Sequence, residues 1–229
     1  MKTLLLASAS PARRATLEAA HIAPQIAVAD VDEDGLLAAA KAADPQIGAA
    51  QQVELLAVAK AQAIAERLSE LPASIGAGGR PSVVVGCDSM LEMGGQVVGK
   101  PRTPEVARER LREMRGNAGD LHTGHCVIDV ASGNMAVGTS TATVHICQLT
   151  DSEIEAYIAT GEPLVVAGSF TIDGYGGPFV ERIEGDHHGV VGISLPLLRH
   201  LLGELGHSIT EFWAAPRQRE LPLRLPRLA

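Results

Sequence analysis

Short apolar runs most constrain what this chain can fold into. The strongest of them, such as VVVG at residues 83–86 and PLVVAG at 163–168, have the length of a β-strand. A helix that spans a membrane needs about 18 or more consecutive apolar residues. At the N-terminus the apolar run covers only Thr3 to Ala7, whereas the core of a signal peptide needs roughly 7–15 residues. We therefore expect a cytoplasmic, soluble protein without a membrane partner.

The composition fits a globular chain with an aliphatic core. Hydrophobic residues make up 46% of the 229 residues and aromatic residues only 3%, so alanine, valine, leucine and isoleucine must build the core. A chain of this length forms one large domain or two closely packed lobes. The net charge of −8 argues against nucleic acid or a membrane surface as a partner. The three cysteines form no C-x-x-C pair, so we expect reduced thiols.

Hydrophobic periodicity and turn residues predict a mixture of strands and helices. We expect a mixed α/β fold in which helices flank a partly antiparallel sheet. Residues 1–213 are predicted to form a single domain, followed by a proline-rich tail at 214–229. Strands are expected at residues 2–8, 24–30, 82–93, 121–130, 135–149, 165–170 and 179–186, and helices at 11–20, 51–71, 103–117, 149–163 and 195–205.

The stretch SASPARR, residues 8–14, predicts a helix start with an unusual charge. Ser10 is placed to cap the helix, and Pro11 to occupy its first position. A capping box would have glutamate where Arg13 stands, and the positive end of the helix dipole disfavours arginine. A bound phosphate, held by free N–H groups, two serine hydroxyls and the guanidinium, would make that arginine favourable. The alternative is that Arg13 and Arg14 extend into solvent.

Three further charged residues stand where they could meet a substrate. Lys60 lies on the apolar face of the predicted helix 51–71, where an ammonium either reaches solvent or pairs with an anion. Asp88 ends a buried strand, a position where α/β folds place ligand-binding carboxylates. Lys100 follows in the next predicted strand segment. Asp88 and Lys100 could bind metal and phosphate, or form an ion pair.

Two motif fragments do not complete their patterns. Residues 94–100 read G-x-x-x-x-G-K, but Pro101 replaces the hydroxyl residue with which a phosphate-binding P-loop holds Mg²⁺. Residues 30–35 match the first half of a calcium-binding EF-hand loop, whose twelfth position requires glutamate and here is Lys41. Within this acidic run, Glu33 either holds Mg²⁺ beside a substrate phosphate or faces water.

The histidines do not predict a metal site. His122 and His125 are three residues apart on a predicted strand, so their side chains point to opposite faces. His187 and His188 are adjacent in a predicted loop. We expect structural or surface roles for all four.

In their order along the chain, these segments resemble the Maf family of nucleoside triphosphate pyrophosphatases. The resemblance covers nearly the whole chain up to about Gly206 and does not explain the residues beyond Trp213. It runs over LLLASASPARRATL, VDED, LAVAKAQAIA, VVVGCDSMLEMGGQVVGKPRTPEVARERL, LHTGHCVI, LTDSEIEAYIATGEPLVVAGSFTIDGYGGPFVERIEGD and VVGISLPLLRHLL.

The resemblance implies two lobes with a central cleft, a fold similar to that of the inosine triphosphate pyrophosphatases. It also implies a divalent cation (Mg²⁺ or Mn²⁺), a nucleoside triphosphate substrate cleaved between its α- and β-phosphates, and a homodimer. The matching residues are Ser8, Ser10, Arg13 and the adjacent Arg14 for phosphate binding, the basic Lys60 and Lys100, the proton-accepting Asp88, and Glu33, which is expected to bind the metal together with Asp88.

These residue types suit the reaction. In-line attack on the α-phosphorus requires a positioned water, a base near it and neutralisation of the charge on the leaving pyrophosphate. We assign activation of the water to Asp88. Lys60, Lys100 and Arg13 would neutralise the phosphates, together with the cation.

Three positions leave the base preference open. Family members that prefer dTTP and UTP have arginine, threonine and glutamine where this chain has Ala12, Ser89 and Asp173. The group that prefers 7-methyl-GTP has a bulky residue, a glutamine and a glutamate at these three positions. Only Asp173 matches that group, through its negative charge. The sequence therefore does not assign a preferred base.

Two rival functions remain. The first is a regulatory nucleotide-binding protein without turnover, because the family is also associated with inhibition of cell division. Such a protein needs cations but has no need of Asp88 beside them. The second is a phosphatase built on D-x-D at Asp30 and Asp32, in which Asp34 stands where threonine or valine is expected.

Overall fold

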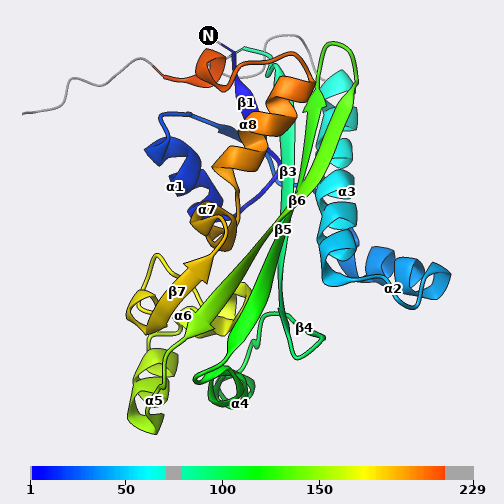
Figure 1. Ribbon diagram of the computed structural model, residues 1–229. Coiled ribbons are helices and arrows are strands. Elements are labelled where there is room, and N and C mark those ends of the chain that lie inside the picture. The colour runs from blue at the N-terminus through cyan, green and yellow to red at the C-terminus, as the bar shows by residue number, and fades with distance from the viewer. Residues whose placement is uncertain (1, 71–78, 215–229) are drawn as a thin grey trace, which may run out of the picture.

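A single sheet runs through the part of the chain that the structure describes. The computed structural model describes residues 2–70 and 79–214, and Figure 1 shows their arrangement. The strands are β1 (Leu4–Leu6), β2 (Gln25–Ile26), β3 (Val83–Met93), β4 (Gln96–Val98), β5 (Ala118–Asp129), β6 (Met135–Ile146) and β7 (Val180–Glu184). The α-helices are α1 (Pro11–Ala19), α2 (Glu33–Ala43), α3 (Ala49–Glu70), α4 (Pro104–Met114), α5 (Asp151–Ala159), α6 (Glu162–Val165), α7 (His187–Val191) and α8 (Leu195–Glu204).

The sheet is mixed, as predicted. In the described residues the strand order is β2-β1-β3-β5-β6-β7, and β4 pairs with β3 outside that order. β2, β1 and β3 are parallel, whereas β4 through β7 pair with antiparallel neighbours. The predicted strands 121–130 and 135–149 correspond to β5 and β6, which form a long antiparallel ribbon. The expected α/β class with a partly antiparallel sheet is confirmed.

Helices cover both faces of this sheet. In Figure 1, α3 lies on one face of the sheet, and α1, α7 and α8 lie on the other. Leu6, Val85 and Leu198 belong to the core on the α8 face, and Val84 and Ala61 to the core on the α3 face. A third apolar cluster lies at the far ends of β3, β5 and β6, where α4 and α5 pack. The three long strands therefore join two lobes.

One edge of β3 is left open between these lobes. β1 pairs with β3 only at Val83–Val85, and β4 pairs with the same strand only at Leu91–Met93. On its other edge, β3 pairs continuously with β5. Among the described strands none therefore covers that edge of β3 over residues 86–90. Unpaired backbone groups at such a gap are available to side chains or ligands.

Two glycines bring α3 unusually close to the sheet. A Cβ atom on Gly86 of β3 would lie 2.2 Å from the carbonyl oxygen of Ala57, and one on Gly124 of β5 would lie 2.4 Å from that of Val53. Any side chain at either position would therefore push the helix away from the sheet. The missing side chains let Lys60, one turn after Ala57, reach the level of the open edge.

The acidic run does not follow a long strand. The predicted strand 24–30 is reduced to the two residues of β2, and Glu33 begins helix α2. The reason is local: the side chain of Asp32 accepts a hydrogen bond from the N–H of Gly35 and caps the helix. Glu33 and Asp34 then occupy the first turn, where acidic side chains are favourable.

Two other predicted segments also differ. Residues 165–170 form the end of α6 and a 3-10 turn rather than a strand, because Gly168 adopts a left-handed conformation with φ of 68° that interrupts an extended run. His187 and His188 lie in the short helix α7 rather than in a loop, because Asp186 caps the backbone N–H groups of His188 and Gly189.

The chain has no membrane-spanning candidate in its described part. None of the helices there combines the length and the apolar character that crossing a bilayer requires. The predicted tail at 214–229 lies outside the described residues except for Ala214, whose N–H donates to the carbonyl oxygen of His21.

Candidate active site

The turn after β1 forms the helix start that the sequence predicted. The Ser10 side chain accepts a hydrogen bond from the N–H of Arg13, and Pro11 occupies the first turn of α1. The Oγ atom of Ser8, a buried residue, accepts from the N–H of Ser10 at 3.2 Å. Within the described residues the N–H of Ala12 has no partner. This turn therefore presents two hydroxyls and a free N–H at the positive end of a helix.

Arg13 is half-buried and does not extend into solvent. Its Nε donates to the carbonyl oxygen of Gly192 at 2.8 Å, and its Nη1 donates to Ser8 Oγ at 3.0 Å and to the carbonyl oxygen of Cys87 at 2.9 Å. Its Nη2 donates to Ser89 Oγ at 3.1 Å. The Cys87 carbonyl lies in the uncovered part of β3. Four of the five N–H groups of the guanidinium are thus engaged, and one remains for a ligand.

Arg14 is not brought to this cluster. Its Nε donates to Oε1 of Glu18 at 2.7 Å, and the side chain is 59% exposed. An exposed pair four residues apart on a helix contributes only about 0.3–0.5 kcal/mol to stability. The solvent-facing alternative therefore describes Arg14 but not Arg13, whose guanidinium is bonded to oxygens of the protein.

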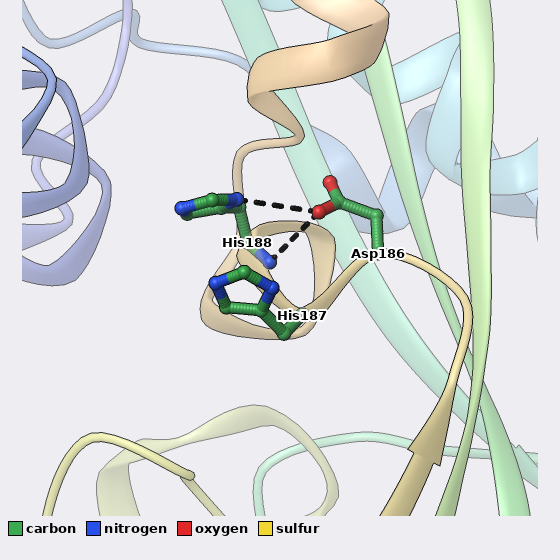
Figure 2. A group of neighbouring side chains, drawn as sticks. All are labelled: Asp186, His187 and His188. Carbon is green, nitrogen blue, oxygen red and sulfur yellow. Dashed lines mark hydrogen bonds and ion pairs between the residues drawn. The ribbon is translucent and has the colours of Figure 1, made fainter.

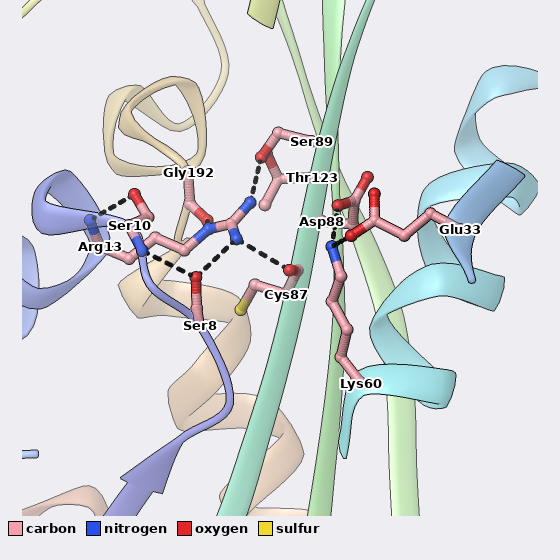
Figure 3. Close-up of polar contacts among 10 residues, drawn as sticks. All are labelled: Ser8, Ser10, Arg13, Glu33, Lys60, Cys87, Asp88, Ser89, Thr123 and Gly192. Atoms are coloured by element: carbon pink, nitrogen blue, oxygen red, sulfur yellow. Dashed lines mark hydrogen bonds and ion pairs between the residues drawn. The ribbon is translucent and has the colours of Figure 1, made fainter. Parts of the chain in front are cut away.

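Lys60 meets two carboxylates on the other side of β3. Its Nζ lies 2.5 Å from Oδ1 of Asp88 and 2.8 Å from Oε1 of Glu33. The side chains of Lys60 and Asp88 are only 12% and 13% exposed, whereas that of Glu33 is 48% exposed. Figure 3 shows this cluster to the right of β3 and the Arg13 cluster to its left. Of the two alternatives considered for Lys60, the structure shows pairing with anions, and the protein itself supplies them.

The two clusters lie on opposite faces of one strand. Asp88 and Ser89 are successive residues of β3, and successive side chains of a strand point to opposite faces. Asp88 faces α3 and Lys60, whereas Ser89 faces α1 and Arg13 (Figure 3). Both clusters border the uncovered edge of β3. A ligand that bridges them must lie across that edge.

Lys100 lies two residues after β4, whose pairing with β3 ends at Val98 opposite Leu91. Lys100 is exposed and has no ion pair or hydrogen bond within the described ranges. The ion pair considered between Asp88 and Lys100 does not form, because Asp88 pairs with Lys60.

The third specificity position lies in a pocket beside α1. Asp173 is exposed and accepts a hydrogen bond from Thr171 Oγ1. The pocket, of about 350 Å³, is lined by Ala15, Thr16, Ala19, Ala20, Asp173, His188, Val191 and Leu195. Ala12 precedes these α1 residues by about one helical turn. The structure therefore brings Asp173 close to the α1 helix.

The carboxylates beside Lys60 could hold a hard divalent cation. One position, now taken by the Lys60 ammonium, already lies within 2.8 Å of an oxygen of Asp88 and of Glu33. Donor sets made only of oxygen suit Mg²⁺ and Mn²⁺. The two residues predicted as metal ligands thus fit that role.

Two polar residues of β5 fix α7 and the start of α8 to the sheet on the side that carries Arg13: Thr123, which the sequence analysis did not identify, and His125, for which it expected only a structural or surface role. Thr123 of β5 is 2.9 Å from Ser89 through their hydroxyl oxygens, and donates to the carbonyl oxygen of Gly189 at 2.8 Å. His125 is fully buried, with Nδ1 3.0 Å from the carbonyl oxygen of Thr123 and Nε2 accepting from the N–H of Ser194 at 2.8 Å. Burial lowers the pKa of His125 to about 4. No local pattern marks these residues, because their partners are set by strand register.

Cys87 is unsuited to act as a nucleophile, although it adjoins Asp88. Its side chain belongs to the buried core on the α8 face, and burial raises the pKa of its thiol to about 11. A thiolate is the reactive form of cysteine. This supports the expected role as a reduced core thiol.

Comparison with known proteins matches nearly the whole described chain to one family. The Maf family, described as Maf-like protein, matches residues 3–205. A protein of Salinispora tropica named nucleoside triphosphate pyrophosphatase is 52% identical over 211 residues, which cover 92% of this chain and 87% of that protein. Proteins of the same name from Nocardia farcinica and Streptomyces coelicolor are 50% and 46% identical, cover 93% of this chain, and are themselves covered over 98% and 95% of their lengths. Because the family model matches residues 3–205 and these relatives are about half identical over most of their length, the chain belongs to the Maf family.

Proposed function

We propose that this protein is a nucleoside triphosphate pyrophosphatase, which releases a nucleoside monophosphate and pyrophosphate. The observation that carries the proposal is the Lys60–Asp88–Glu33 cluster, which borders an uncovered strand edge opposite the Arg13 cluster. Relatives 46–52% identical over more than nine-tenths of this chain bear the name of that activity. A simple phosphate binder would need the cations but not a carboxylate between them.

Asp88 acts as the base that activates water. Lys60 contacts its Oδ1, and no donor is bonded to its Oδ2 within the described residues. That oxygen can accept the proton of a water aimed at the α-phosphorus. The adjacent ammonium of Lys60 offsets negative charge on the attacked group. When bound by Asp88 and Glu33, Mg²⁺ or Mn²⁺ supplies further neutralisation of the phosphates.

The turn after β1 and Lys100 bind the phosphate chain from the two ends of the open edge. Ser8 and Ser10 offer hydroxyls, Ala12 its free N–H, and Arg13 its remaining N–H group. Lys100 approaches from the β4 side. Arg14 contributes long-range positive charge at most, because it pairs with Glu18.

The nucleoside occupies the pocket beside α1. Its volume of about 350 Å³ lies at the lower end of the range typical of small-molecule sites. Asp173 supplies one acceptor to this pocket, Ala12 precedes its α1 residues by about one helical turn, and Ser89 is held by Arg13 and Thr123. These three positions would set the preference for the base.

We further propose a single domain over residues 1–213 that acts in the cytoplasm as a homodimer. The family match over residues 3–205 and the sheet that joins both lobes support the single domain. The net charge of −8 supports the absence of nucleic-acid and membrane partners. Size-exclusion chromatography with light scattering tests the dimer directly.

The test is a panel of nucleoside triphosphates with Mg²⁺, in which pyrophosphate and orthophosphate are measured separately. We expect pyrophosphate release, reduced about 100- to 10,000-fold in Asp88→Asn, because the general base is lost. Asp34→Asn, on the exposed side of α2, serves as the matched control. Tight binding without turnover on any nucleotide would favour the regulatory binder, and orthophosphate alone would favour the D-x-D phosphatase.

A further inference from the structure

Three consecutive residues outside the candidate active site gather metal-binding atoms. Asp186, His187 and His188 follow β7 and begin α7, and each offers one ligand atom within 4.8 Å of the other two. Figure 2 shows the two imidazole rings one above the other, with the carboxylate of Asp186 beside them. Sequence reasoning considered the two histidines alone and assigned them no metal. Only the helical turn of α7 brings both of them next to Asp186.

The spacing of these atoms suits a metal ion. Nδ1 of His188 lies 3.3 Å from Oδ1 of Asp186. Two ligands that each lie about 2.1 Å from a tetrahedral zinc ion are about 3.4 Å apart. The rings of His187 and His188 have their centroids 3.8 Å apart and are tilted by 37°. The ligand atom of His187 lies within 4.8 Å of those of Asp186 and His188, so a rotation of its side chain is the movement that binding of an ion requires.

The protein holds the carboxylate and the helix in place. Oδ1 of Asp186 accepts from the N–H of His188 at 3.2 Å, and Oδ2 accepts from the N–H of Gly189 at 3.1 Å. The far end of α7 is fixed by the bond from Arg13 to Gly192. Hydrogen bonds that orient a ligand in this way typically raise metal affinity. The site is therefore partly formed before any ion binds.

His187 is the member that the fold does not otherwise use. It is exposed, and within the described residues it has neither a hydrogen bond nor an ion pair. Asp186 caps α7, and His188 lines the pocket beside α1. The competing interpretation is a helix cap with two stacked surface rings and no ligand.

We propose that Asp186, His187 and His188 form a second divalent-metal site, which binds a late first-row ion such as Zn²⁺ through two imidazole nitrogens and one carboxylate oxygen. Imidazole donors favour Zn²⁺, Co²⁺ and Ni²⁺ over Mg²⁺. The site differs from the oxygen-only pair of Asp88 and Glu33, which lies on the opposite face of β3. It does not depend on the proposed hydrolysis, since its test is binding.

The test is titration of the metal-free full-length protein with Zn²⁺ by calorimetry, and with Co²⁺ by its visible absorption. Both are carried out in an Asp88→Asn background, so that the oxygen-only pair contributes less. We expect one ion per chain, bound about tenfold or more weakly in His187→Ala, because direct ligands matter at least as much as the residues that orient them. Mg²⁺ at equal concentration should not displace it.

The matched control is His200→Ala, another exposed histidine, which pairs with Glu204 on α8. This control should bind Zn²⁺ as the parent does. The unfolding temperature of each metal-free variant establishes that its fold is intact, since His187 makes no bond to the rest of the fold. Equal Zn²⁺ affinity in His187→Ala and the control, or no binding to the parent, would overturn the proposal. Either result would leave the proposed hydrolysis of triphosphates standing, because that proposal is tested separately.

Discussion

Arg13 joins three segments of the chain through a single guanidinium. It bonds the turn after β1 at Ser8, the uncovered part of β3 at Cys87 and Ser89, and the end of α7 at Gly192. A glutamate at this position would complete a capping box for α1 but could not donate to these oxygens. The unfavourable position in the helix dipole is thus offset by hydrogen bonds to fixed acceptors, and a bound phosphate would add to them.

We expect Arg13→Lys to impair both stability and activity. Lysine keeps the charge but replaces the planar guanidinium by a single ammonium nitrogen. Most of the four hydrogen bonds are therefore lost. The stability should fall by about 2 kcal/mol, since hydrogen bonds to charged groups contribute about 1.5–3 kcal/mol. Urea unfolding and the kinetics of triphosphate hydrolysis measure the two effects. Arg14→Lys is the matched control, and equal behaviour of the two variants would contradict the anchoring role.

At the scale of elements, the packing of α3 decides where Lys60 lies. Gly86 and Gly124 leave no side chain between the sheet and the helix, and Lys60 reaches Asp88 across that contact. We expect Gly124→Ala to lower stability by about 1–3 kcal/mol, as overpacked substitutions do, and to reduce hydrolysis by moving Lys60 away from Asp88. Thermal unfolding and steady-state rates test this.

The matched control for that substitution is Gly203→Ala in α8. A Cβ atom there would meet nothing within 4 Å, and alanine in a helix is about 0.5–1 kcal/mol more favourable than glycine. Gly203→Ala should therefore unfold at a higher temperature and keep its activity. If Gly124→Ala behaved in the same way, the close contact of α3 would not be what positions Lys60.

Elements with strong local signals could be predicted from the sequence. The apolar spacing of Val53, Leu56 and Ile64 predicted α3, and all three are buried. Residues 165–170 were predicted as a strand from their valines, but the turn at Gly168 overrides that propensity. The uncovered edge of β3 follows from two strands that pair with the same side of it. The partnership of Lys60 with Asp88 depends on that pairing and on helix docking, which no local pattern encodes.

At the scale of the whole molecule, polar contacts join the two ends of the described chain. Lys2 pairs with Glu211 at 2.9 Å and lies 2.6 Å from Nδ1 of His207. Nε2 of His207 lies 2.8 Å from Oδ2 of Asp129 at the end of β5. Hydrogen bonds from Ser132, opposed by burial and helped by His207, lower the pKa of Asp129 to about 2. The segment after α8 is thereby fixed to the sheet.

His125 links the centre of the sheet to the start of α8, and its contacts exist only for the neutral ring. Nε2 accepts from the N–H of Ser194, while Nδ1 donates to the carbonyl oxygen of Thr123. A proton on Nε2 would place an N–H group of the ring directly against the N–H of Ser194, in a fully buried site. This agrees with the lowered pKa, about 4 against an ordinary 6.5, which results mainly from burial.

Protonation of His125 should make the whole fold less stable in mild acid. Between pH 6.5 and 4 the unfolded chain binds a proton that the folded chain does not, so stability falls as the pH falls. The contribution is complete above pH 6.5 and is lost progressively toward pH 4. A difference of 2.5 pKa units corresponds to about 3 kcal/mol.

We expect His125→Gln to be less stable than the parent at pH 7.5 but to lose less stability on acidification. Urea unfolding at pH 7.5, 6.0 and 4.5 measures both. The difference in unfolding free energy between parent and variant should shrink by about 2–3 kcal/mol between the first and last pH. The other histidines are present in both proteins, so the comparison cancels their effect. Parallel curves for the two proteins would mean that burial of His125 does not couple the fold to pH.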